Sequence, residues 1–182
     1  PGRRFLAVDR NVHGLAMNLK AANPDPSAAR QNLDFVGGGL SFIFNSSLQS
    51  MQPLNHLRRI RGSVDFLSNY ALGTLEGLHN LERIEGYLDI DDNQSLTTLN
   101  GLNGLVHIEK DLIIRFNDAL TSFDLSALTS VGGTFFLKGN GALTSFDLSA
   151  LTSVGGVLRV YGNALTSIEI PALAAAGGLQ EL

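Results

Sequence analysis

An asparagine recurs through this chain at nearly constant spacing, and this repeat constrains the fold more than any other feature of the sequence. The members of the asparagine column are Asn45, Asn69, Asn93, Asn117, Asn140 and Asn163. Their spacing is constant up to Asn117 and shorter by a single position after it. A repeat of about 23 to 24 residues predicts structural units that stack in one direction, each contacting only its neighbours.

Apolar residues around each asparagine follow two different periods. Leu88 and Ile90 lie two residues apart before Asn93, which predicts a short strand with one face inward. After it the apolar residues of that coil come every third position: Leu96, Leu99, Leu102, Leu105 and Ile108. This second period fits neither a helix of 3.6 residues per turn nor a regular strand, so it predicts short extended or 3₁₀ segments joined by corners.

The two periods together predict a right-handed β-solenoid that is mostly strand, with short 3₁₀ or irregular segments. The segment 119–133 recurs letter for letter at 142–156, as stacked copies would. An asparagine that ends each strand and points inward would bond to buried backbone groups, forming an asparagine ladder. Asn45 and Asn93 also lie in glycosylation sequons, but we favour the structural role because both belong to the inward column.

The pattern G-x-L-x-I-x-x-N, followed by leucines at every third position, resembles the receptor L-domain type of leucine-rich-repeat solenoid. The best match begins at Gly86 and runs through Asn93 to Ile108. The resemblance covers residues 38–182 and implies an L-domain-like superhelix from a secreted or cell-surface protein that binds a ligand. Receptor L domains usually carry disulfides, whereas this chain has no cysteine, so the cysteine-free surface proteins are the closer likeness.

The two ends depart from the repeat. We expect residues 1–37 to form an N-terminal cap with a helix over roughly 8–22 and an incomplete coil, ahead of a solenoid over 38–182. At the other end, 178–182 reads as the start of a further coil. The sequence therefore predicts an open C-terminal edge that favours self-association.

Composition and charge exclude several classes of function. The net charge is −4 with scattered Lys and Arg, which argues against nucleic acid as a partner. No apolar run approaches the roughly 18 residues of a membrane helix, so we expect no membrane insertion. The absence of cysteine excludes disulfides and cysteine-based metal sites, and no nucleotide-binding or catalytic motif is present, so no cofactor is expected.

Asp65, Asp89 and Asp91 are the one group of residues with some potential for chemistry. Asp65 and Asp89 occupy the same outward strand position in adjacent coils, where a calcium ion would relieve their repulsion. Paired carboxylates would also serve a carbohydrate-active enzyme, although the basic and aromatic residues of a cleft are scarce here. We expect the histidines to be solvent-facing loop residues, and the column of Thr97, Thr121 and Thr144 to line turns.

The outward strand positions of the last coils have the composition of a binding surface. They combine apolar and aromatic residues with positive charge: Ile113, Arg115, Phe136, Lys138, Arg159 and Tyr161. The sequence therefore predicts a non-catalytic binding or adhesion module that recognises a protein or glycan through this face. The alternatives are a structural spacer or assembly solenoid, and the carbohydrate-active enzyme.

Overall fold

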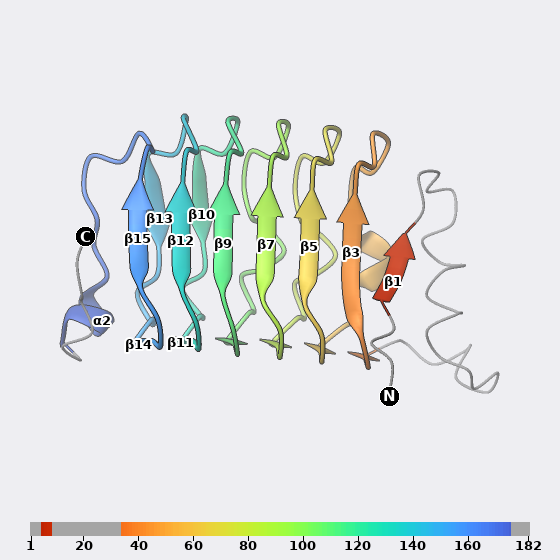
Figure 1. Ribbon diagram of the computed structural model, residues 1–182, viewed down its shortest axis with the longest axis horizontal. Helices are drawn as coiled ribbons and strands as arrows, with labels where there is room; N and C mark the ends of the chain where they lie inside the picture. The colour runs from red at the N-terminus through yellow and green to blue at the C-terminus, as the bar shows by residue number, and fades with distance from the viewer. Residues whose placement is uncertain (1–4, 9–33, 176–182) are drawn as a thin grey trace.

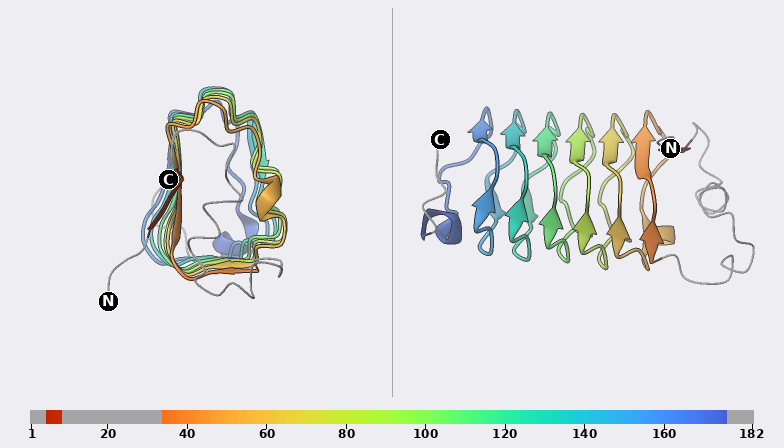
Figure 2. Two further views of the ribbon diagram at one scale, coloured as in Figure 1. Left: turned by 90° about the vertical axis from the view of Figure 1, so that its right-hand side faces the viewer. Right: turned by 60° about the horizontal axis from the view of Figure 1, so that its bottom comes forward.

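Successive coils of the chain stack into an elongated array (Figure 1), in a computed structural model that describes residues 5–8 and 34–175. Seen along the array, the coils superpose closely and enclose a common interior (Figure 2). The strand pairings of the described residues are parallel and join neighbouring coils. The predicted solenoid is thus confirmed as a parallel β-solenoid that is nearly all strand.

The first wall is a seven-stranded sheet in which each strand comes from a different coil. Its order is β1 (Phe5–Val8), β3 (Gly39–Ile43), β5 (Val64–Leu67), β7 (Leu88–Asp91), β9 (Leu112–Arg115), β12 (Phe135–Lys138) and β15 (Leu158–Tyr161). The register follows the repeat, so Leu88 pairs with Val64 on one side and with Leu112 on the other. Alternation therefore sends the same columns inward and outward along the whole sheet.

The second wall is a six-stranded sheet of two-residue strands. Its members are β2 (Phe35–Val36), β4 (Arg59–Ile60), β6 (Arg83–Ile84), β8 (His107–Ile108), β11 (Ser130–Val131) and β14 (Ser153–Val154). The third wall changes along the array. It holds a 3₁₀ helix, η2 (Gln52–Leu54), near the start and a two-stranded sheet of β10 (Ser122–Asp124) and β13 (Ser145–Asp147) near the end.

The interior is filled by the apolar rows that the repeat predicts. Leucines such as Leu99, Leu102 and Leu105 have no exposed surface. Phe42 and Phe66 stack with ring centroids 5.0 Å apart. Each fully buried leucine contributes roughly 2 kcal/mol from removal of apolar surface from water, and stacking allows every coil to bury its row against the next.

The asparagine column lies inside the array and forms a continuous hydrogen-bonded ladder. The backbone N–H of Asn93 donates to Oδ1 of Asn117 at 3.0 Å, and its side-chain Nδ2 donates to the carbonyl of Phe66 at 2.9 Å. The same bonds recur at Asn69, Asn117 and Asn140. Backbone groups at the strand ends are satisfied in this way without water. Asn93 is fully buried, and its side chain has a structural role in the ladder.

The predicted N-terminal helix is wrong at Val8, the one position of it that the structure describes, whereas β2 pairs with β4 in the register expected for an incomplete first coil. Val8, the expected start of a helix, lies in β1 and pairs with Phe42 of β3. Strand pairing wins there because an unpaired edge of β3 would leave backbone groups without partners. The rest of the expected helix, 9–22, lies outside the described residues.

The C-terminal edge that the sequence predicts to be open is partly covered: among the described residues β15 ends the first wall, and the inward residues Phe146 and Val160 are partly buried. A short helix, α2 (Pro171–Ala175), lies at this end of the array (Figure 1). Ile170 and Leu173 are buried in the hydrophobic core, because the last apolar row would otherwise face water. The predicted further coil at 178–182 lies outside the described residues. Within the described part of the chain, no helix has the length and apolar character needed to cross a membrane.

Candidate binding surface

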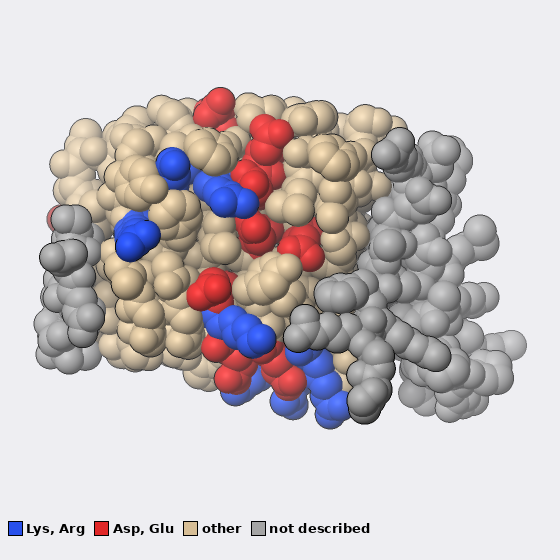
Figure 3. Space-filling model, viewed as in Figure 1, with Lys and Arg blue, Asp and Glu red and all other residues tan. Residues whose placement is uncertain are grey.

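The outward side chains of the first wall form one continuous surface, which we call the strand face. Alternation along each strand creates columns of residues that continue from coil to coil. The central column is Ser41, Asp65, Asp89, Ile113, Phe136 and Arg159. The column beside it is Ile43, Leu67, Asp91, Arg115, Lys138 and Tyr161. Acidic side chains gather near the middle of this face, with basic ones toward its C-terminal side (Figure 3).

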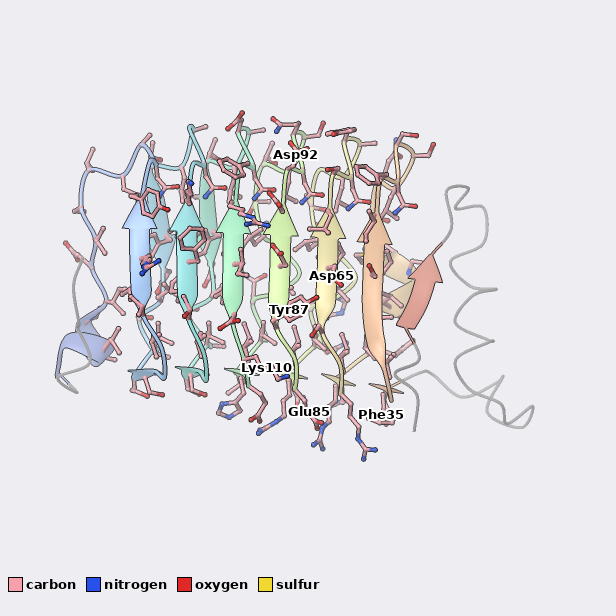
Figure 4. The ribbon with its side chains drawn as sticks, viewed as in Figure 1. Phe35, Asp65, Glu85, Tyr87, Asp92 and Lys110 are labelled. Carbon is pink, nitrogen blue, oxygen red and sulfur yellow. The ribbon has the colours of Figure 1, made fainter. Side chains whose placement is uncertain are left out.

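Asp65 and Asp89 pair in register, as the sequence predicts, and lie close to each other on adjacent strands. Asp65 is buried, with 9% of its surface exposed, and hydroxyls of Tyr87 and Ser41 hydrogen-bond to it. Figure 4 shows Asp65 and Tyr87 together on this face. Burial raises the pKa of Asp65, and the two hydroxyls oppose this shift because they stabilise the carboxylate.

Arg115 provides the positive charge that this acidic group needs. Its Nη2 lies 2.9 Å from Oδ2 of Asp91 and 3.7 Å from Oδ2 of Asp89. Burial raises the pKa of Asp89 to about 6, the Arg115 guanidinium opposes the shift, and the charges of Asp91 and Asp65 add to it. The Oδ1 atom of Asp89 is buried without a hydrogen-bond partner. Asp89 is therefore held in an environment that disfavours its ionised form.

This acidic group does not have the geometry of the metal site considered above. Among residues 34–175, no three His, Asp or Glu side chains converge in a way that would hold a metal ion. Arg115 lies beside Asp89 and Asp91, where a bound cation would otherwise compensate their charge.

The C-terminal part of the strand face carries aromatic rings around a lysine. Lys138 Nζ lies 5.4 Å from the ring centroid of Phe116 and 5.3 Å from that of Tyr161. Phe136 meets the Tyr161 ring edge-on at a centroid distance of 5.6 Å. Tyr161 is 48% exposed and Phe116 is 42% exposed. Lys138 and Arg159 form no ion pair with any described carboxylate, so their charge is available to a partner.

The structure brings together all six residues predicted for this surface, since Arg115 pairs in register with Lys138. Phe136, Lys138, Arg159 and Tyr161 form its C-terminal part, and half-buried Ile113 adjoins them in the central column. Arg115 differs because its charge is already neutralised by the aspartates.

Phe116 is the residue of this surface that the sequence analysis missed. It follows strand β9 at a φ of 55°, a conformation in which a bulky residue is strained. The next coil has a glycine at the equivalent position, and a Cβ on Gly139 would lie 2.9 Å from the Phe116 ring. The glycine therefore leaves room for the ring to lie over the neighbouring coil. The sequence does contain a signal for this. At the turn position after the strand, one coil has Phe116 and the next coil has Gly139.

The remaining candidate residues have structural explanations or lie apart. His107 was expected in a solvent-facing loop, but it is half-buried in strand β8, where its Nδ1 lies 2.9 Å from Oγ of Ser130. The threonine column lines a turn, since Thr121 Oγ1 donates to the carbonyl of Thr97 at 3.2 Å and Thr144 repeats the bond to Thr121.

A shallow hollow of about 350 Å³ lies on the third wall, away from the strand face. Its lining is Gln52, Glu76, Gly77, His79, Asn100, Gly101 and Asn103. None of these residues belongs to the predicted binding surface. Comparison with known protein families, with curated proteins and with solved structures finds no match to this chain.

Proposed function

We propose that this chain is a non-catalytic binding or adhesion module of a secreted or cell-surface protein, and that it recognises a protein or glycan through the strand face. The observation that carries the proposal is the group of Phe116, Lys138 and Tyr161, in which two exposed rings flank a cation without an acidic partner among the described residues. Exposed aromatic residues and arginine are enriched at interfaces and supply most of their binding energy. Arg159, exposed beside this group, adds a second cation.

The rigidity of the scaffold supports the same proposal. The residues of the surface stand on strands whose inward neighbours, such as Leu112, Phe135 and Leu137, are fully buried. Side chains on such strands lose little further freedom when a partner binds, which favours affinity.

We further propose that the coils wind right-handed and belong to the L-domain type of leucine-rich repeat. The handedness is supported by a general rule, since connections between parallel strands of one sheet are right-handed in about 98% of cases. The type is supported by the strand that ends in a buried asparagine, as at Asn93, followed by leucines at every third position. Secretion or display at the cell surface rests on this resemblance.

The test combines binding with stability. Beads coated with the chain would be assayed for adhesion to a glycan array, to cells and to one another. We expect replacement of Phe136, Arg159 and Tyr161 by alanine to abolish the adhesion that the original chain shows, with an unchanged melting temperature. A matched control replaces Phe35, Arg58 and Tyr70, which lie off the strand face and include two exposed aromatic residues.

Retention of all adhesion by the strand-face variant would overturn the proposal. The non-catalytic part has a separate test, in which the chain is incubated with a panel of polysaccharides. We expect no released product, and release that depends on Asp65 or Asp89 would assign the chain to the carbohydrate-active enzymes instead.

A further inference from the structure

The charges of the strand face are arranged antisymmetrically about its strand β9. Two coils before β9 the central column holds Asp65, and two coils after it the same column holds Arg159. In the adjacent column, Asp91 lies one coil before β9 and Lys138 lies one coil after. The acidic and basic positions of these two pairs therefore exchange when the order of coils is reversed about β9, whereas Asp89 corresponds to the apolar Phe136.

This arrangement suits a pair of chains in which the two strand faces meet. The second copy is obtained from the first by a rotation of 180° about an axis that lies between the two faces and runs parallel to β9. Such a rotation places two strand faces against each other, keeps every residue in its column and reverses the order of coils. It sets β12 opposite β7 and β15 opposite β5. Lys138 of one copy then faces Asp91 of the other, and Arg159 faces the position of Asp65, whose side chain is largely buried beneath the surface. A two-fold interface of this kind is self-complementary, with every contact made twice.

The apolar residues follow the same symmetry. Tyr161 faces Leu67, which is half-buried, and Ile113 lies on the axis and meets its own copy. Arg115 also lies on the axis, but its contacts with Asp91 and Asp89 turn its charge toward β7 of its own copy. Like charges therefore do not meet at the centre without compensation.

From this complementarity we propose that the partner of the strand face is a second copy of this chain, bound face to face about β9. The proposal rests on the proposed function, because it names the partner of the same surface. The strands of the face are only four residues long over most of the sheet. The footprint is accordingly small, and we expect a weak dimer with a dissociation constant on the order of micromolar or higher.

The test is sedimentation equilibrium of the chain over a wide range of concentrations. We expect reversible dimers whose affinity falls roughly tenfold between low salt and physiological ionic strength, because exposed charges are screened. Lys138→Glu combined with Arg159→Glu makes both halves of the face acidic and should reduce the affinity more than tenfold. Arg61→Glu combined with Lys110→Glu is the matched control, since both cations are exposed and precede the strand face in their coils, as Figure 4 shows for Lys110.

A second variant separates complementarity from net charge. Replacing Asp65, Asp89 and Asp91 with asparagine moves the net charge from −4 toward zero, which by itself favours association. The face-to-face dimer predicts the opposite, a weaker dimer, because Lys138 and Arg159 lose their partners. Circular dichroism would check that each variant keeps its strand content.

Two results would overturn the inference. One is a chain that stays monomeric at all concentrations in low salt, and the other is a dimer that survives reversal of Lys138 and Arg159. If the chain is monomeric while the alanine variant at Phe136, Arg159 and Tyr161 still loses adhesion to a glycan or cell, the proposed function holds and the partner is a different molecule. If both fail, the strand face is not a binding surface.

Discussion

The chain has two kinds of coil. We call the coils up to Asn117 the longer coils, and those after it, which lack one residue, the shorter coils. Both kinds bury equivalent apolar rows, but they differ in two of their walls. The residue is lost between two inward positions. In a longer coil Asn100 and Gly101 separate the inward Leu99 and Leu102, whereas in a shorter coil Asp124 alone separates the equivalent Phe123 and Leu125. Gly101 has a φ of +110° in its turn, whereas Asp124 ends the strand β10. Phe123, larger than the equivalent Leu99, fills the interior of the shortened wall. One deletion thus exchanges a glycine turn for a strand while the core is kept.

The outward surfaces differ as well. Ion pairs link neighbouring coils on the second wall of the longer coils, joining Arg58 to Glu82, Arg59 to Glu85 and Arg83 to Glu109. The equivalent positions of the shorter coils carry Ser, Thr and Gly, and no ion pair joins those coils among the described residues. The inward rows specify the fold in both regions, and the outward residues are free to specialise.

The largest expected effect concerns the asparagine ladder where the two regions meet. Asn117→Leu removes the acceptor of the Asn93 N–H and the donor to the Ile90 carbonyl, all of them buried. We expect a loss of about 4 kcal/mol in the free energy of unfolding, because more than one buried polar group is left unpaired. Urea denaturation measures the loss.

Asn163→Leu is the matched change at the end of the ladder. Asn163 is partly exposed, and water can replace its bonds, so we expect a loss of about 1 kcal/mol. Equal losses at Asn117 and Asn163 would contradict the idea that burial gives the ladder its value.

The next effect concerns the glycine turn of the longer coils. A Cβ at Gly101 would clash with the Leu75 carbonyl oxygen, and φ is +110° there. We expect Gly101→Ala to cost about 3 kcal/mol, since the clash is with backbone and cannot be relieved by a side-chain rotation. Gly141→Ala in a shorter coil meets only ordinary contact at 3.8 Å and should change stability by less than about 0.5 kcal/mol. Thermal unfolding of both variants decides whether this asymmetry exists.

Replacement of Asp89 is expected to raise the stability of the fold, in contrast to the substitutions above, and by a smaller amount. The pKa of Asp89 is about 6 in the folded chain against 3.8 for an ordinary aspartate, so the folded state binds the proton more tightly. The tighter binding of the proton stabilises the folded state. This stabilisation is fully present below the ordinary pKa and is lost as the pH rises through about 6. Asp89→Asn should therefore stabilise the chain at neutral pH by about 1 kcal/mol.

The check is the pH dependence of the midpoint of urea unfolding. The gain from Asp89→Asn should shrink as the pH falls toward about 4, because the protonated aspartate resembles asparagine. A gain that grows on acidification would mean that Arg115 holds Asp89 ionised.

The smallest effect is expected for the ion pairs of the longer coils. Arg58 and Glu82 have more than half of their side chains exposed, so Arg58→Ala should cost less than about 0.5 kcal/mol and less still at high salt. A cost above about 1 kcal/mol would show that the ion-pair rows stabilise the longer coils, and that the two regions differ in stability as well as in surface.

The repeat allowed most of the fold to be predicted from the sequence, because inward positions such as Leu88, Ile90 and Asn93 are restricted by burial in every coil. The ends were harder to predict. Val8 belongs to a helical stripe in the sequence, yet strand pairing with Phe42 decides its conformation. Local periodicity carries no information about such pairing between distant segments.

The candidate surface could be predicted only in part. The columns of the strand face follow from the register, so Phe136 and Tyr161 were identified. The pairing of Arg115 with Asp91 was missed because it depends on the rotamer of a long side chain that crosses to the preceding coil. Phe116 was missed because its place on the surface depends on a left-handed turn and on the space left by Gly139.

The most direct test of the central claim is oxidative footprinting of exposed aromatic residues by hydroxyl radicals. Tyr161 and Phe116 lie at the C-terminal part of the strand face, whereas Tyr70 and Phe35 are comparably exposed elsewhere. A concentrated solution at low salt would be compared with a dilute one, and a sample with any ligand identified by adhesion would be compared with one without it. We predict that Tyr161 and Phe116 become protected while Tyr70 and Phe35 do not. Protection confined to Tyr70 and Phe35, or no protection under any of these conditions, would contradict the assignment of the strand face as the binding surface.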